Sequence, residues 1–142
     1  MKCTRQITDD LYYVGGSVRR IALFENCFPV PDGVAYNSYL LMDEKTVLFD
    51  TVDYAIGRQF TDNLTSLLDI RKLDYLVVNH MEPDHCSLIT QIISLYPDLK
   101  LIANKKTIGL ISQFYNIDMA ERTVFVADGD SFSTGKHNLK LF

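Results

Sequence analysis

The sequence predicts an α/β (α+β) fold, in which a mixed sheet carries helices on its outer face and begins with a β-rich half. Three observations support this prediction. Short apolar runs separated by Gly, Pro and Asp turns occupy the chain up to Asp50. An apolar spacing of three and four residues, typical of a helix, follows directly. Strand and helix patterns then alternate to the end, and this order favours a layered α/β arrangement.

The first half contains strands that are separated by recognisable turns. Gly15-Gly16 and the segment PVPDG at residues 29–33 are typical turn sequences. A further polar break at residues 43–45 separates two apolar runs. We therefore expect strands at residues 11–14, 18–24, 36–42 and 46–50, the last two as a hairpin or meander.

The second half opens with an amphipathic helix, predicted by the apolar residues Ile56, Phe60, Leu64, Leu67 and Leu68. A strand follows at residues 73–79. Its apolar run at residues 76–78 does not alternate with polar residues, which is typical of a strand buried on both faces. Beyond it we expect helices at residues 87–95 and 105–115, and strands at residues 99–103, 123–127 and 138–142.

The bulk composition excludes several classes of protein. The 142 residues are 47% hydrophobic and 23% charged, as expected for one globular domain, and the net charge of −4 argues against nucleic acid as a partner. No apolar run approaches the roughly 20 residues that span a bilayer, and the N-terminus lacks a signal-peptide pattern. Three cysteines give no paired spacing, so reduced thiols and a cytoplasmic location are expected. Because the chain stops inside a strand pattern, we expect the domain to be incomplete at its C-terminus.

One short segment concentrates the chemistry. His80, Glu82, Asp84 and His85 lie directly after the predicted buried strand. Side chains that follow such a strand are free to converge at the carboxyl edge of the sheet. Four of them on one tight turn could hardly all close around a single ion. The spacing therefore predicts that His80 and Glu82 serve one metal, and Asp84 and His85 a neighbouring one.

The types of ligand restrict the metal. Two imidazoles and two carboxylates suit iron, manganese or zinc and disfavour copper(I). We hypothesise that the extra negative charge of Glu82 favours a redox-active iron pair over a hydrolytic zinc pair. Two alternatives remain at this point. A polar loop after a strand also carries solvated side chains without any ligand, and Asp84 or Ser87 could cap the next helix.

Other polar residues receive secondary roles. Asp50 ends an apolar strand, and its carboxylate could accept the free N–H of a ligand imidazole, or merely begin the next turn. Asp53 is predicted to start a helix. His137 has no ligand-type residue spaced near it and is predicted to be a surface residue. Cys86 is expected to be a semi-buried thiol beside the site, because an imidazole that binds a metal cannot act as its base.

The pattern His80-x-Glu82-x-Asp84-His85 resembles the metal motif of the flavodiiron proteins, a branch of the metallo-β-lactamase fold with Glu82 where hydrolases usually have His. The resemblance extends through residues 33–40 (GVAYNSYL) and 47–52 (VLFDTV), and more weakly through Tyr96-Pro97 and Gly129-Asp130. It implies a metallo-β-lactamase-like αββα sandwich. Residues 1–142 are then a partial di-iron domain, and no flavodoxin-like domain is expected within them.

The resemblance also implies a function. His80 and Glu82 would bind one of two Fe ions and Asp84 and His85 the other, with a bridging Asp and two more His outside this chain. The family reduces O₂ to water or NO to N₂O. Electrons come from FMN in a flavodoxin-like domain across a head-to-tail homodimer, or from a donor such as rubredoxin. Residues 24–29 lack the histidine that many members carry in the equivalent loop near the irons.

The sequence is therefore compatible with three functions. The first is a di-iron oxidoreductase, with no catalytic residue assigned beyond the metal ligands. The second is a metal-dependent hydrolase that uses a metal-bound hydroxide, which Glu82 disfavours. The third is a non-catalytic truncated fragment. Because two ligands are fewer than a catalytic metal usually has, we expect residues 1–142 alone to bind metal weakly or not at all and to be inactive.

Overall fold

The structure is a computed structural model that describes residues 3–142. Its helices and strands, in chain order, are β1 (Arg5–Gln6), β2 (Leu11–Tyr13), β3 (Gly16–Val18), β4 (Leu23–Phe24), β5 (Phe28–Pro29), β6 (Val34–Tyr36), β7 (Tyr39–Met42), β8 (Thr46–Phe49), a 3₁₀ turn η1 (Tyr54–Ile56), α1 (Gly57–Leu68), β9 (Tyr75–Val77), α2 (Pro83–Cys86), α3 (Ile89–Leu95), β10 (Lys100–Ala103), α4 (Lys105–Tyr115), a 3₁₀ turn η2 (Ala120–Arg122), β11 (Thr123–Phe125), β12 (Ser131–Ser133) and β13 (Asn138–Lys140).

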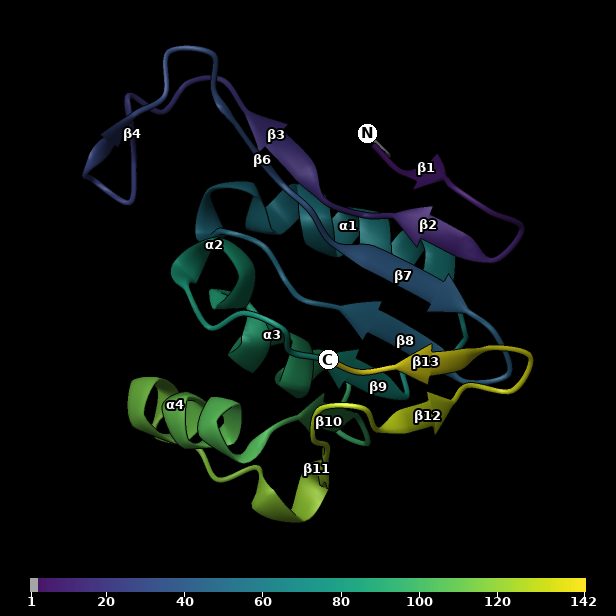
Figure 1. The fold of residues 1–142 in the computed structure, drawn as a ribbon. Coiled ribbons are helices and arrows are strands. Elements are labelled where there is room, and N and C mark those ends of the chain that lie inside the picture. Colours follow the sequence, from purple (N-terminus) through teal and green to yellow (C-terminus); the bar gives the residue numbers. More distant parts are fainter. Residues whose placement is uncertain (1–2) are drawn as a thin grey trace.

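A seven-stranded mixed sheet organises the molecule, with the strand order β1-β2-β7-β8-β9-β10-β11 (Figure 1). The strands from β1 to β8 pair antiparallel, whereas β8, β9, β10 and β11 pair parallel. The pairing changes from antiparallel to parallel at β8 because the type of connection between the strands changes there. A three-residue break joins β7 to β8, whereas helices connect the parallel strands, as parallel pairing requires. The predicted mixed sheet and β-rich first half are confirmed.

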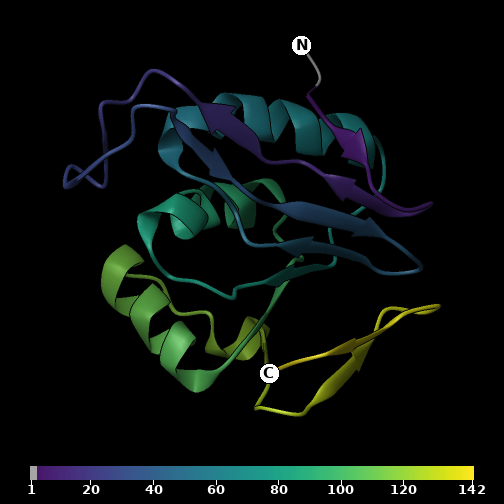
Figure 2. The same cartoon turned by 45° about the horizontal axis from the view of Figure 1, so that its top comes forward.

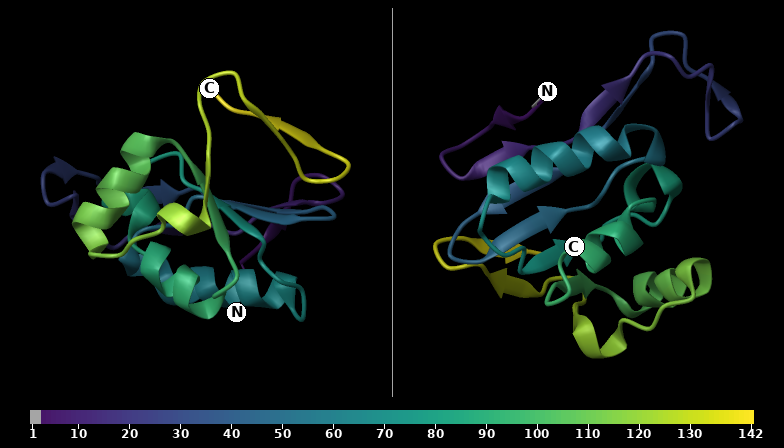
Figure 3. Two further views of the ribbon diagram at one scale, coloured as in Figure 1. Left: turned by 90° about the horizontal axis from the view of Figure 1, so that it is seen from below. Right: turned by 180° about the vertical axis from the view of Figure 1, so that it is seen from behind.

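Helices cover one face of this sheet, on which α1 and α3 lie (Figure 3). The apolar stripe of α1 buries Phe60, Leu64 and Leu68 in the main core cluster, and α4 adds Ile108 and Ile111 to it. Complete burial of such side chains contributes roughly 1.5–3 kcal/mol each. Within residues 3–142, none of the helices combines the length and apolar character that a membrane span requires.

A hairpin of β12 and β13 covers the opposite face of the sheet (Figure 3, left). Val77 of β9 lies on this face and belongs to the second core cluster, whereas Leu76 belongs to the main core cluster on the helical face. Strand β9 is thus buried on both faces, as its unbroken apolar run predicted. The hairpin is also tied by Asp43, whose carboxylate accepts hydrogen bonds from the Thr134 hydroxyl at 2.7 Å and from two backbone N–H groups.

A two-stranded arm of β3 and β6 projects beyond the sheet, with β4 and β5 at its tip (Figures 1 and 2). The prediction of one continuous strand over residues 18–24 is wrong. Residues 19, 20 and 22 form bends, and the chain reverses after β4 because Glu25 and Asn26 adopt left-handed backbone angles of φ 49° and 57°. The sequence pattern also missed β12, which is too short to show an alternation.

Candidate metal site

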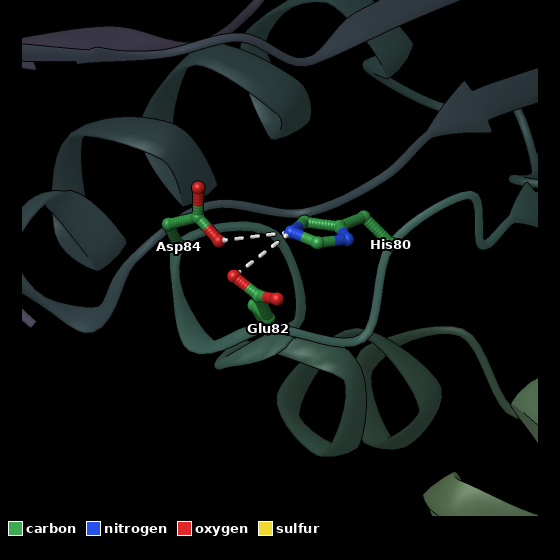
Figure 4. A group of neighbouring side chains, drawn as sticks. All are labelled: His80, Glu82 and Asp84. Atoms are coloured by element: carbon green, nitrogen blue, oxygen red, sulfur yellow. Dashed lines mark ion pairs between the residues drawn. The ribbon is translucent and has the colours of Figure 1, made fainter.

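The predicted ligand segment lies beyond the carboxyl end of β9, beside the end of β8. His80 and Glu82 occupy the connecting loop, while Asp84 and His85 lie in the single turn of α2. The three side chains His80, Glu82 and Asp84 point toward one another (Figure 4). Pro83 is the first residue of α2, where its fixed φ and missing N–H are tolerated.

The alternative that Asp84 or Ser87 caps the start of the next helix is wrong. Glu82 and Leu88 occupy the N-cap positions of α2 and α3, and neither makes a side-chain cap bond, whereas Ser87 is the C-cap residue of α2. The Ser87 hydroxyl instead donates back to the Pro83 carbonyl. The carboxylate of Asp84 is thereby left for another role. Asp53, in contrast, caps η1 as predicted, since its carboxylate accepts from the Ala55 N–H at 2.7 Å.

The candidate ligand atoms converge closely. His80 Nε2 lies 3.3 Å from a Glu82 carboxylate oxygen and 3.8 Å from Asp84 Oδ1. The other Asp84 oxygen, Oδ2, lies 3.4 Å from His85 Nε2. One ligand atom from each of His80, Glu82 and Asp84 falls within 4.8 Å of the others. The Asp84 carboxylate therefore lies between the two imidazoles, with one oxygen toward each.

Two polar atoms of this group are buried and lack a hydrogen-bond partner within the described part of the chain. The side chains of Asp84 and His85 are only 16% and 22% exposed, whereas those of His80 and Glu82 are 46% and 62% exposed. Asp84 Oδ1 and His85 Nδ1 are both buried without a hydrogen-bond partner among residues 3–142. Buried polar atoms of this kind are uncommon. The unpaired Asp84 Oδ1 lies toward His80 Nε2, and together with this donor set of imidazoles and carboxylates it fits a bound first-row metal such as iron, manganese or zinc.

Asp50 anchors the start of the ligand segment. Its carboxylate accepts from the Asn79 backbone N–H at 2.7 Å, from the Asn79 side-chain amide at 3.1 Å and from the His80 N–H at 3.4 Å. The donors of these bonds are a side-chain amide and two backbone N–H groups, and none of them is an imidazole. The predicted hydrogen bond from a ligand imidazole to Asp50 is therefore absent among the described contacts. Burial raises the pKa of Asp50, although the bonds from Asn79 oppose that shift.

Thr51 anchors the end of the same segment. Its hydroxyl and its backbone N–H both donate to the His85 carbonyl, at 2.8 and 2.9 Å. Thr51 is fully buried, so its hydroxyl would be costly to leave unpaired. Thr51 has no role among the predictions from sequence. Two signals could have found it: its position next to Asp50 at the end of a buried strand, and its place within residues 47–52, which carry the family resemblance.

The remaining candidates lie as follows. Cys86 is buried, and burial raises the pKa of its thiol, which is unfavourable for a nucleophile.

The His137 side chain is about half exposed, as predicted for a surface residue. It nevertheless has an unpredicted partner, because its Nε2 lies 2.7 Å from the Asp10 carboxylate. The Glu25–Asn26 turn, which lacks the histidine noted above, lines a cavity of about 390 Å³ with Pro83.

Comparisons with known proteins show the family to which this fold belongs. The model of the family described as "ODP family beta lactamase" matches residues 34–142. A nitric oxide reductase of Moorella thermoacetica is 36% identical over 134 residues, which are 94% of this chain and 33% of that protein. The rubredoxin oxygen:oxidoreductase of Desulfovibrio gigas superposes with a TM-score of 0.89 at 28% identity, covering 96% of this chain and 34% of that one.

A variant of a flavo di-iron protein from Thermotoga maritima has a TM-score of 0.87 at 28% identity, over 96% of this chain and 35% of that one. The chain thus spans about a third of the length of these relatives. Its family model covers most of the chain, and the sheet with its helical face is shared with the solved structures. The chain belongs to the ODP family of β-lactamase-like domains and is similar over its length to flavodiiron proteins.

Proposed function

We propose that residues 1–142 form part of the di-iron domain of an oxidoreductase that reduces O₂ to water, or NO to N₂O. In this proposal His80 and Glu82 bind one iron, and Asp84 and His85 bind the other. The similarity to a nitric oxide reductase and to a rubredoxin oxygen:oxidoreductase supports this choice of substrates. Electrons would come from FMN in a flavin partner, or from a donor such as rubredoxin, in a homodimer.

The observation that carries the proposal is the position of the Asp84 carboxylate. Its Oδ1 lies toward His80 and its Oδ2 toward His85, at 3.8 and 3.4 Å. An ion held by the converging group of His80, Glu82 and Asp84 would use one oxygen of this carboxylate, whereas a second, neighbouring ion would use the other oxygen together with His85. The two carboxylates offset positive metal charge in a site that is partly shielded from water.

This chain's residues supply binding and orientation. The imidazoles of His80 and His85 must be neutral to bind a metal, and their backbone is held by Asp50 and Thr51. An iron pair bound here would provide the exchangeable electrons and the binding positions for the diatomic substrate. Two protein ligands per ion are fewer than a catalytic metal usually has. The remaining ligands would therefore come from outside residues 1–142.

The test is the metal content of the full native protein that contains this chain, purified without oxygen from iron-replete cells. We compare the wild type with Glu82→Gln, and use Glu121→Gln, an exposed carboxylate in η2, as the matched control. We expect an iron pair in the wild type and the control, and loss of at least one iron with loss of O₂ and NO reduction in Glu82→Gln.

Two results would contradict the proposal. Stoichiometric zinc without iron would favour a hydrolase, which can be checked by measuring turnover of an ester or lactam without any reductant. Equal iron in the wild type and Glu82→Gln would remove Glu82 from the ligand set. Elemental analysis of residues 1–142 alone then shows how much of the affinity resides in these four side chains.

A further inference from the structure

A second group of polar contacts lies behind the ligand segment. Cys86 is the last residue of α2 and follows His85 directly. Its sulfur lies 3.2 Å from the carbonyl oxygen of Met81, the residue between His80 and Glu82. One contact therefore joins the part of the segment that carries the first two candidate ligands to the part that carries the other two.

Tyr115 completes this group from a distant part of the chain. It is the last residue of α4, and its hydroxyl lies 2.7 Å from the Cys86 carbonyl oxygen and 3.3 Å from the Cys86 sulfur. Its ring packs against the main core cluster, so the hydroxyl is presented from a fixed support. Because the Tyr115 hydroxyl lies closer to the Cys86 carbonyl than to the sulfur, it donates to the carbonyl. The Cys86 thiol then donates to the Met81 carbonyl.

The contacts meet a specific structural need. A helix of one turn, such as α2, leaves its last carbonyls without partners within the helix. The His85 carbonyl is bound by the Thr51 hydroxyl, and the Cys86 carbonyl by the Tyr115 hydroxyl. Two consecutive carbonyls are thus held from two separate parts of the chain, the loop after β8 and the end of α4. This fixes the orientation of α2, and with it the direction of the Asp84 and His85 side chains.

We propose that Cys86 and Tyr115 are positioning residues, which set the distance between the His80–Glu82 and the Asp84–His85 halves of the metal site. This inference rests on the proposed function. Metal sites depend on such outer contacts, and their loss typically lowers metal affinity by about 10–100-fold. The thiol acts here as a hydrogen-bond donor in a buried position, and not as a metal ligand or a nucleophile.

The main test is Tyr115→Phe, which removes one oxygen and keeps the ring. Tyr96→Phe is the matched control, because Tyr96 also packs against the main core cluster and its hydroxyl has no hydrogen-bond partner among residues 3–142. Iron(II) affinity of the full native protein is measured without oxygen by competition with a chelator. We expect affinity to fall about 10-fold or more in Tyr115→Phe and to stay unchanged in Tyr96→Phe.

A second readout needs no metal. Amide hydrogen exchange of residues 81–87 is measured in the metal-free protein, where loss of the Tyr115 hydroxyl should speed exchange in this segment but not in α1. Cys86→Ala and Cys86→Ser form a further pair. Ser retains a hydrogen-bond donor. The exchange rate of residues 81–87 and the iron affinity of Cys86→Ser should therefore lie between those of the wild type and of Cys86→Ala.

The outcomes separate this inference from the proposed function. If the wild type binds no iron, the proposed function fails, and exchange alone then decides whether the two residues hold the segment. Unchanged exchange and unchanged affinity in Tyr115→Phe would overturn the inference. An equal loss in Tyr96→Phe would also overturn it, because the effect would then belong to core packing and not to the hydroxyl.

Discussion

The Asp50 carboxylate accepts a hydrogen bond from the Asn79 backbone N–H at 2.7 Å, and so ties the end of β8 to the residue before the candidate ligand His80. Asp50 also adopts a left-handed backbone angle, φ 56°, which few residues other than Gly, Asn and Asp tolerate. The same residue thus turns the chain and holds the neighbouring loop. Its backbone role and its side-chain role can be separated by mutation.

We predict that Asp50→Asn lowers the free energy of unfolding by about 1–3 kcal/mol. Asn accepts the same backbone angle, and its Oδ1 can still accept from the backbone N–H groups of Asn79 and His80, but its NH2 group would face the Asn79 side-chain amide, where a carboxylate oxygen accepted that donor. Urea denaturation followed by circular dichroism measures the change. Asp69→Gly is the control, since Asp69 is exposed and also has positive φ, 50°. It should leave stability unchanged or raise it, and an equal loss in both variants would refute the side-chain role.

Thr51 should be sensitive to loss of its hydroxyl. Thr51→Val keeps the shape but removes the donor to the His85 carbonyl, and we expect a loss of about 1–2 kcal/mol. Thr51→Ser retains the hydroxyl and should be less destabilised than Val. Denaturation of both variants in parallel checks the prediction. A Val variant as stable as the wild type would show that the Thr51 backbone N–H alone holds His85.

Two glycines should respond in opposite ways to substitution by alanine. A Cβ on Gly15 would lie 2.1 Å from the Tyr36 carbonyl oxygen, whereas a Cβ on Gly109 would have no atom within 4 Å. We expect Gly15→Ala to cost about 1–3 kcal/mol through backbone displacement. Gly109→Ala in α4 should gain up to about 1 kcal/mol from helix propensity. Thermal denaturation distinguishes the two, and a tolerated Gly15→Ala would contradict the close approach of β3 and β6.

The pair of Asp10 and His137 should make the attachment of the hairpin depend on pH. The hydrogen bond to Asp10 raises the pKa of His137, and the same bond lowers the pKa of Asp10. The His137 contribution is complete below its unfolded value near 6.5 and is lost as pH rises through the raised pKa. The Asp10 contribution is complete above about 3.8 and is lost as pH falls through the lowered pKa. The pair therefore stabilises most between these limits.

Proton NMR titration of the His137 ring tests this directly. Asp10→Asn should lower the His137 pKa toward its ordinary value, and exchange of the β12 and β13 amides should become less dependent on pH. Asp9→Asn, in the same turn, is the control for a general change of charge. Asp43 and Lys136 also act on His137, with opposite signs. A similar shift in both variants would assign the effect to net charge and not to the 2.7 Å contact.

The sequence determined the features that depend on neighbouring residues. The α1 stripe and the doubly buried run of β9 follow from side-chain periodicity, and both were confirmed. The clustering of His80, Glu82, Asp84 and His85 was visible because the four residues fall within six positions, although which metal each serves stays a prediction. The family followed from the same motif, and the comparisons confirmed it.

Tertiary structure alone decided which residues distant in the chain contact one another. Tyr115 reaches Cys86 across 29 positions, and His137 reaches Asp10 across 127. Nothing in the local pattern around these residues indicates a partner, because such contacts depend on how helices and hairpin pack on the sheet. The same holds for Asp50, whose carboxylate bonds to Asn79 only because β8 and β9 are parallel neighbours. Short-range spacing determined the candidate ligands, and the packing of strands and helices determined which residues contact the segment that carries them.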